Sequence, residues 1–246
     1  MITEQILILG ASSGIAKAIA KQTLQNRHIQ VTVISRNTTF YELMANDYNN
    51  LNIINIADYS PEKINDVVTT LSNKSNAPIT HAYLCHGILH NDNIQPEKKL
   101  EDIKVHSFEE VMKANALTPM LWVQKLTPLL HSKTICKLVV LSARVGSISD
   151  NHLGGWYSYR ASKAALNMML KNAAIEFSRR AKNIKIIAFH PGTTDTALSK
   201  PFQKNVPKGK LFTTDFVARQ LIAITDATNV DGQLSYLDWQ GEKITW

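Results

Sequence analysis

Cysteine is scarce in this sequence. Cys85 and Cys136 are the only two in 246 residues, and each lies inside or beside a run of apolar residues. A disulfide-stapled secreted fold needs more thiols, and a cysteine metal site needs them clustered, so both are excluded. We expect two small buried residues in a reducing, cytoplasmic compartment, and no bound metal.

Long apolar runs are also missing. No run approaches the roughly 18 residues that a membrane-spanning helix requires. The first residues, Met1 to Glu4, lack the basic stretch with which a signal peptide begins. The sequence therefore predicts neither a membrane partner nor a secretory signal.

Positive charge is not concentrated in any stripe. Lys and Arg number 27 against 20 Asp and Glu, and the net charge of +7 is spread along the chain. Because no dense basic stretch with interleaved aromatics is present, no nucleic-acid partner is predicted. The charge is compatible with an anionic cofactor or substrate. Four lysines in residues 193–212 fit a solvated loop, with an anionic substrate as the alternative: Lys200, Lys204, Lys208 and Lys210.

Linkers and repeats are absent, and what is present is an alternation of apolar runs and helical patterns. The runs lie at 6–9, 31–34, 53–56, 81–85, 138–141, 184–189 and 234–237, and the helical patterns near 14–25, 61–71, 108–130, 161–177 and 216–225. Such alternation predicts βαβ units, and near-continuous apolar strands are covered on both faces. We predict an α/β fold, a doubly wound parallel sheet with helices on both faces, in one domain over residues 1–246.

A glycine-rich turn follows the first predicted strand. Gly10-x-x-x-Gly14-x-Ala16 opens the first predicted helix. Glycines let the backbone approach a pyrophosphate, whose charge is favoured at a helix N-terminus. The pattern indicates a dinucleotide-binding loop, with a tight strand-to-helix turn as the structural alternative.

Tyr159 and Lys163 form the second motif. Four residues apart on a helix, they share one face. A nearby ammonium lowers the pKa of a phenol, so the pair suits proton transfer near neutral pH. The alternative is a half-buried packing tyrosine. Tyr59 and Lys63 have the same spacing, but Ser60 and Pro61 mark a helix start between them, so the geometry fails there.

Asn115 precedes Pro119 by four residues within a helical pattern. Proline has no N–H, so the carbonyl of residue 115 loses its intrahelical donor and the helix is kinked there. A carbonyl freed in this way can bind a water. The alternative is that Asn115 merely tolerates the kink.

These motifs together resemble the short-chain dehydrogenase/reductase family. The glycine loop, Asn115, the Tyr159–Lys163 pair and Pro191-Gly192 stand in the family's order and at its intervals, and the likeness covers nearly the whole chain. The run from Gly146 to Lys163 resembles the subgroup of C-factor-like and sniffer-type carbonyl reductases. The resemblance implies a Rossmann-type domain of seven parallel strands and hydride transfer between a nicotinamide and a carbonyl or alcohol carbon.

The resemblance also implies roles for individual residues. Tyr159 would be the general acid/base, Lys163 would lower its pKa and hold the nicotinamide ribose, and Asn115 would hold a water of a proton relay. Asp58 matches the position that contacts adenine, and residues 193–212 match a mobile substrate lid. The implied cofactor-binding residues are Gly10, Ser12, Ser13, Gly14, Ile15, Arg36, Asp58, Gly87, Asn115, Tyr159, Lys163, Pro191, Gly192, Thr194 and Thr196.

Three positions depart from the family's pattern. Ala16 stands where glycine is usual, and His86 stands in place of an asparagine. We expect a buried, hydrogen-bonded histidine, with a pH-sensitive group near the adenosine side as the alternative. The family's catalytic serine falls three residues before Gly146, where this chain has Ala143. The adjacent Ser142 is the expected donor to the carbonyl oxygen, with another serine, or none, as alternatives.

The leading hypothesis is an oxidoreductase that acts on a small carbonyl or alcohol substrate and prefers NADP(H) to NAD(H). The second strand ends at Arg36 without an acidic residue, and an arginine there suits a 2′-phosphate. The alternative function is a cofactor-binding scaffold or signalling protein with little catalysis. Helices 108–130 and 161–177 are apolar around most of their circumference, which predicts a homodimer or homotetramer.

Overall fold

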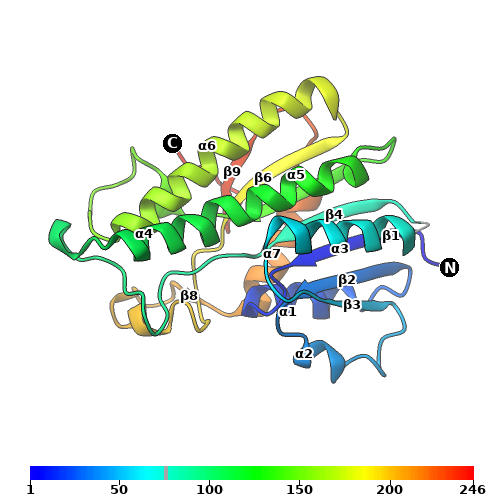
Figure 1. The fold of residues 1–246 in the computed structure, drawn as a ribbon, viewed down its shortest axis with the longest axis horizontal. Coiled ribbons are helices and arrows are strands. Elements are labelled where there is room, and N and C mark those ends of the chain that lie inside the picture. The colour runs from blue at the N-terminus through cyan, green and yellow to red at the C-terminus, as the bar shows by residue number, and fades with distance from the viewer. Residues whose placement is uncertain (75–76) are drawn as a thin grey trace.

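Seven parallel strands form one sheet in the computed structural model, which describes residues 1–74 and 77–246 (Figure 1). Their order across the sheet is β3-β2-β1-β4-β5-β6-β9, and every neighbouring pair is parallel. The predicted α/β fold is therefore confirmed. The strands are β1 (Glu4–Leu9), β2 (Ile29–Ser35), β3 (Leu51–Asn55), β4 (Ile79–Leu84), β5 (Cys136–Leu141), β6 (Ile184–His190) and β9 (Ser235–Asp238).

The strand order reverses between β1 and β4. The chain builds β1, β2 and β3 outward in one direction, then returns through α3 to place β4 on the other side of β1. In doubly wound sheets the carboxyl ends of the strands at such a reversal form the ligand crevice. The glycine turn at Gly10 follows β1, and His86 and Gly87 follow β4, so both lie at this edge.

Helices cover both faces of the sheet (Figure 1). One face packs against α3, α5 and α6, and the other against α1 and α7. The strands alternate between the two cores: Leu7 and Leu9 face the first, and Ile6 and Ile8 the second. This double burial explains why the strands read as continuous apolar runs. The helices are α1 (Gly14–Thr23), α2 (Thr39–Glu42), α3 (Pro61–Lys74), α4 (Val105–Met112), α5 (Thr118–Leu130), α6 (Tyr157–Arg180) and α7 (Thr214–Ala227).

Two segments near the site differ from the predicted elements. The helix expected over 108–130 is divided: a π-helical turn at Lys113–Leu117 separates α4 from α5. Residues 193–212 are not wholly irregular, because Thr193–Thr194 (β7) pairs with Leu211–Phe212 (β8) and a 3-10 helix covers Lys200–Asn205. A strand of two residues is too short to show a periodic pattern, so the sequence does not indicate β7 or β8.

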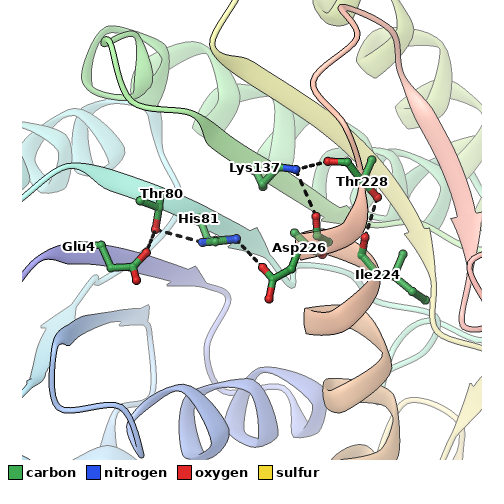
Figure 2. Close-up of polar contacts among 8 residues, drawn as sticks. Glu4, Thr80, His81, Lys137, Ile224, Asp226 and Thr228 are labelled. Carbon is green, nitrogen blue, oxygen red and sulfur yellow. Dashed lines mark hydrogen bonds and ion pairs between the residues drawn. The ribbon is translucent and has the colours of Figure 1, made fainter.

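Polar contacts fasten the opposite, amino-terminal edge of the sheet (Figure 2). Thr80 donates to Glu4 at 2.6 Å, and His81 contacts Thr80 and Asp226, each at 3.1 Å. Burial lowers the pKa of His81, although the Asp226 carboxylate favours its protonation. Lys137 donates to the carbonyls of Thr225 and Thr228 at the end of α7, where a cation is favoured by the helix dipole. These contacts lie away from the crevice and hold α7 on the sheet.

Two further predictions concern the cysteines and membrane-spanning helices. Cys85 and Cys136 are both buried and unpaired, as expected. Among the described residues, no helix combines the length and the apolar character that crossing a bilayer would need.

Candidate active site

The glycine turn brings the backbone of β1 close to the segment after β4. Gly10 has φ of 69°, a left-handed conformation that favours glycine. A Cβ at Gly10 would lie 3.0 Å from the carbonyl carbon of Cys85 and 3.0 Å from the amide nitrogen of His86. Ser13 caps α1 by accepting from the Ala16 N–H at 3.2 Å, while Ser12 is exposed and Ile15 is buried. The turn therefore leaves a backbone cradle at a helix N-terminus, the arrangement that binds phosphate groups.

Tyr159 and Lys163 lie one turn apart on α6, as the spacing predicts. Both are buried, with 9% and 3% of their surfaces exposed. The Lys163 ammonium donates to the Leu141 carbonyl at 3.0 Å and lies 5.8 Å from the centre of the Tyr159 ring. A Cβ at Gly87 would come within 3.5 Å of the Lys163 Nζ. The pair thus faces the crevice beside the turn that follows β4.

Burial shifts the pKa values of both groups. It raises the pKa of the Tyr159 phenol, with Tyr236 acting in the same direction, and it lowers the pKa of Lys163 to about 8. The expected lowering of the phenol pKa by Lys163 is therefore not seen in this structure. The physical reason is desolvation, which disfavours the charged form of either group. At neutral pH the phenol is protonated and able to donate.

Asn115 lies at the centre of the π-helical turn. It is fully buried; its side-chain oxygen accepts from the Ile88 N–H at 2.7 Å, and its amide donates to the Ile88 carbonyl at 2.8 Å and to Ser162 Oγ at 3.0 Å. π turns inside helices are frequent at functional sites. Asn115 therefore ties the segment after Gly87 to α6, next to Lys163. Pro119, at the start of α5, marks this break in the sequence.

Gly146 contacts Lys163, although in the sequence its position indicated only where the family's serine falls. A Cβ at this position would lie 2.8 Å from the carbonyl carbon and from the Cβ of Lys163. Only glycine allows the turn after β5 to approach α6 this closely, so Gly146 helps to fix Lys163. The family's spacing of a glycine after the fifth strand is the signal that points to it.

A cluster of apolar side chains surrounds the Tyr159 ring. Trp156 contacts Tyr159 edge to face, with ring centres 6.1 Å apart, and Phe202 packs against Trp156 at 5.1 Å. Phe202 comes from residues 193–212, the segment expected to be a lid, so this segment contributes a side chain to the cluster beside Tyr159. The four lysines of the segment are exposed and fit a solvated surface. The residues of this apolar cluster are Leu89, Ala143, Val145, Trp156, Tyr159, Leu198 and Phe202.

Residues 4–207 match the family described as short chain dehydrogenase, which is most of the chain. The chain belongs to the short-chain dehydrogenase family. It is therefore an oxidoreductase of a family that binds NAD(P). The resemblance drawn from the sequence motifs is confirmed.

Two bacterial relatives of this short-chain dehydrogenase align with more than half of its chain. It is 27% identical to the C-signal protein of Myxococcus xanthus over 147 residues, which cover 60% of this chain and 83% of that protein. It is 23% identical over 246 residues to a benzil reductase, (S)-benzoin forming, of Bacillus subtilis (strain 168), covering 94% and 97% of the two chains.

Among solved structures, NADPH-bound carbonyl reductase from chicken fatty liver superposes with a TM-score of 0.86 at 20% identity over 100% of both chains. The carbonyl reductase Sniffer of D. melanogaster gives 0.85 at 19% identity over 99% of this chain and 100% of that one. At such identities the likeness establishes the fold.

The crevice of this dehydrogenase fits a dinucleotide. A side chain at Gly10 would press on the backbone of Cys85 and His86, and a Cβ at Gly87 would approach the Lys163 Nζ, so glycine keeps the chain open at both positions. Pro191 and Gly192 follow β6 at the same edge; Gly192 has φ of 70°, and a Cβ there would lie 2.7 Å from the Phe212 ring. Thr194 donates to the Pro191 carbonyl at 3.4 Å, and the Thr196 methyl would lie 3.3 Å from a Cβ at Gly14. The predicted cofactor-binding residues of these loops therefore converge.

Arg36 and Asp58 lie at the far end of the crevice, after β2 and β3. The exposed Arg36 guanidinium stacks on the Tyr59 ring, 5.0 Å from its centre. Asp58 accepts from the Ser60 N–H at 2.7 Å, and hydrogen bonding by the Ser60 side chain, together with this backbone N–H, lowers the pKa of its carboxyl. Tyr59 precedes α3, so its spacing to Lys63 is not helical, as predicted.

His86 is buried as expected, but it is not hydrogen-bonded. Neither ring nitrogen has a partner among the described residues, and the ring packs edge to face on Tyr59 at 4.7 Å. Burial lowers the pKa of His86 to about 3, with Arg36 and Lys163 adding to the effect. The ring is therefore neutral and offers a donor and an acceptor next to the glycine turn.

Ser142 and Ala143 have different surroundings from those expected of a catalytic serine. The Ser142 hydroxyl is buried and donates to Asn167 Oδ1 at 2.7 Å, two turns along α6 from Tyr159. The residue that packs against Tyr159 is Ala143. The structure does not bring the Ser142 hydroxyl together with the Tyr159–Lys163 pair, because successive residues of an extended chain point in opposite directions.

Proposed function

We propose that this short-chain dehydrogenase is an NADP(H)-dependent reductase of small carbonyl compounds. The observation that carries the proposal is the buried Tyr159–Lys163 pair, beside Gly87 and at the same sheet edge as the glycine turn. When bound, the nicotinamide supplies or accepts the hydride. The protein must then hold the carbonyl and supply a proton to its oxygen.

Tyr159 is the proposed proton donor. Its raised pKa keeps the phenol protonated at neutral pH, and the protonated phenol is the form that can give a proton to a developing alkoxide. Lys163, a buried cation with one carbonyl partner, would hold the ribose hydroxyls and stabilise the phenolate that remains. Asn115 holds the segment after Gly87 and would keep a water near Lys163 for reprotonation. The hydrogen bonds of Asn115 with Ile88 and Ser162 support this arrangement.

The other proposed cofactor contacts follow the crevice. The N-terminus of α1, with Gly10, Ser12, Ser13, Gly14 and Ile15, would hold the pyrophosphate. Asp58 and Gly87 would lie along the adenosine half, and Pro191, Gly192, Thr194 and Thr196 along the nicotinamide half. We propose that residues 1–246 form one cofactor-binding domain with a substrate lid at 193–212.

The direct test is oxidation of NADPH with a panel of carbonyl compounds, followed by the loss of NADPH absorbance. The apolar side chains clustered around Tyr159 suit aromatic ketones and diketones, so benzil and quinones belong in the panel beside aliphatic aldehydes. Steady oxidation with any of them supports the proposal. Tight binding of NADPH without turnover on the whole panel would instead favour a cofactor-binding scaffold or signalling protein.

Arg36 is proposed to bind the 2′-phosphate of NADP(H). A hydrogen-bonded ion pair contributes about 1.5–3 kcal/mol, so Arg36→Ala should weaken NADPH binding about 10- to 100-fold and NADH binding far less. Fluorescence titration of both cofactors gives the two affinities. Arg27→Ala is a matched control, because Arg27 also stacks 5.0 Å from a tyrosine ring centre, that of Tyr48. An equal loss for NADPH and NADH would contradict the assignment.

Ser142, proposed from the sequence to serve the carbonyl oxygen, can be tested against its neighbour. Ser142→Ala leaves Asn167 without its donor, which should cost about 1–3 kcal/mol of stability, and should lower turnover if this hydroxyl serves the oxygen. Ala143→Ser places a hydroxyl against Tyr159 and should raise turnover if the family's donor belongs there. Thermal unfolding and steady-state rates separate the two effects. Unchanged turnover in Ser142→Ala would remove Ser142 from the mechanism.

We also propose that the chain forms a homodimer or homotetramer through α5 and α6. Several residues that suggested this, among them Trp122, Leu126 and Leu170, are in the chain's own core. Leu117 and Met168 remain, with 50% and 63% of their surfaces exposed, and Ile175 of α6 is also exposed, at 44%. Light scattering at micromolar concentration should give a multiple of the 27.5 kDa chain mass, and Met168→Lys should shift it toward the monomer. A monomeric wild type would contradict the proposal.

A further inference from the structure

Glu97 is a buried carboxylate that the proposed chemistry does not yet use. It lies in the long segment between β4 and α4, and only 4% of its surface is exposed. No cation of the described residues lies within ion-pairing distance of its carboxylate. A buried, unpaired carboxylate is costly unless other dipoles satisfy it. The contacts that do so all lie at the start of the helix that carries Tyr159.

Both carboxylate oxygens of Glu97 accept from Ser158. One accepts the Ser158 N–H at 3.1 Å, and the other accepts the Ser158 hydroxyl in a very short contact. The backbone carbonyl of Glu97 also accepts the Trp156 N–H at 2.5 Å. Three hydrogen bonds therefore fasten Glu97 to the residues immediately before Tyr159, although 61 residues of chain separate Glu97 from Ser158.

The start of α6 needs an outside partner. The N–H groups of a first helical turn have no partner within the helix, and a Ser, Thr, Asp or Asn at the N-cap usually supplies one. Here the N-cap is Trp156, which makes no side-chain cap and has φ of 52°, a left-handed conformation that is rare for a bulky residue. The first turn of α6 also has no acidic residue. Glu97 supplies both the missing acceptor and the negative charge that a helix N-terminus favours.

The left-handed conformation of Trp156 connects the Glu97 contacts to the site. Its ring packs against both Tyr159 and Phe202, so the left-handed turn aims an aromatic wall at the phenol. Such conformations persist only where the surroundings hold them. Glu97 holds the backbone of Trp156 and of Ser158, two residues further on. It also lines a small hollow together with Leu89, Ser158 and Tyr159.

We propose that Glu97 is a positioning residue for Tyr159, acting through Ser158 to fix the first turn of α6 and the direction of the phenol. The inference rests on the proposed role of Tyr159 as proton donor. Displacing a reacting group by about 1 Å can cost about 100-fold in rate. Loss of Glu97 should therefore reduce turnover without removing any group that touches substrate or cofactor.

The test compares Glu97→Ala, Glu97→Gln and Ser158→Ala with Glu101→Ala, an exposed acidic residue four positions on in the same segment. Glu97→Ala should lower kcat about 10- to 100-fold per NADPH-binding site, while the Kd for NADPH stays unchanged because Lys163 lies a turn further along. Glu97→Gln keeps the volume and one acceptor, so its kcat should lie between those of Glu97→Ala and wild type. Ser158→Ala should resemble Glu97→Gln, and Glu101→Ala should equal wild type.

Amide hydrogen exchange gives a readout that does not depend on turnover. The amides of Trp156 and Ser158 should exchange faster in Glu97→Ala, and to a smaller extent in Glu97→Gln. If Glu97→Ala does not fold, Glu97→Gln and Ser158→Ala carry the test. Wild-type kcat in both of these variants, with unchanged exchange, would overturn the proposal. If instead the wild type reduces no carbonyl, the proposed function fails, while the exchange data still decide whether Glu97 fixes the start of α6.

Discussion

Tyr159→Phe should bind NADPH and fold like the wild type, yet turn over carbonyl substrates about 10²–10⁴-fold more slowly. The substitution removes one hydroxyl and keeps the ring, which packs against Trp156, Leu89 and Ala143. Because the buried phenol is protonated at neutral pH, it is the group able to donate to the alkoxide. Steady-state rates with the best substrate of the panel, and NADPH titration of the same samples, give the two quantities.

Tyr59→Phe is the control for this prediction, because Tyr59 has the same spacing to a lysine but precedes its helix. It should leave kcat near the wild-type value. A Tyr159→Phe protein with near-wild-type reductase activity would show that the proton comes from elsewhere, and the proposed mechanism would then be wrong whatever the family.

Lys163→Ala should lose both turnover and cofactor affinity. The Lys163 ammonium is buried and has one described hydrogen-bond acceptor, the Leu141 carbonyl, so it is available to ribose hydroxyls and to the developing phenolate. A charged hydrogen bond contributes about 1.5–3 kcal/mol, which corresponds to about 10- to 100-fold in NADPH affinity. The loss in kcat should be larger than the loss in affinity, because the same cation also serves the phenolate. Titration and initial rates measure the two losses.

The pH dependence of cofactor binding tests the same residue. Burial lowers the pKa of Lys163 to about 8 in the free protein, so the ammonium is present below that pH and is lost as the pH rises through it. NADPH affinity of the wild type should therefore fall above about pH 8, and the affinity of Lys163→Ala should not follow this curve. Lys171→Ala, two turns along the same helix, should behave like the wild type. A wild-type affinity that is flat from pH 7 to about 10 would contradict the role of the ammonium, since this range spans the shifted and the ordinary lysine pKa.

Local patterns in the sequence were sufficient for the sheet, the glycine turn and the Tyr159–Lys163 pair. Each depends on a short-range rule: apolar runs for covered strands, glycine for a left-handed turn, and a four-residue spacing for one helix face. The sequence also predicted the break at Asn115, because Pro119 removes a donor within the same helix. The sequence did not reveal that the break is a π-helical turn, since a missing N–H does not specify how the neighbouring carbonyls are paired.

Contacts between distant segments decided the rest. Only the folded chain shows that Ala143, and not Ser142, packs against Tyr159, that Gly146 touches Lys163, and that Glu97 fastens the start of α6. The direction of the Tyr159 pKa shift belongs to the same class. The sequence placed a cation near the phenol, but burial by surrounding segments outweighs it. Desolvation and close approach are properties of the space around a residue, and that space is filled by residues far away in the chain.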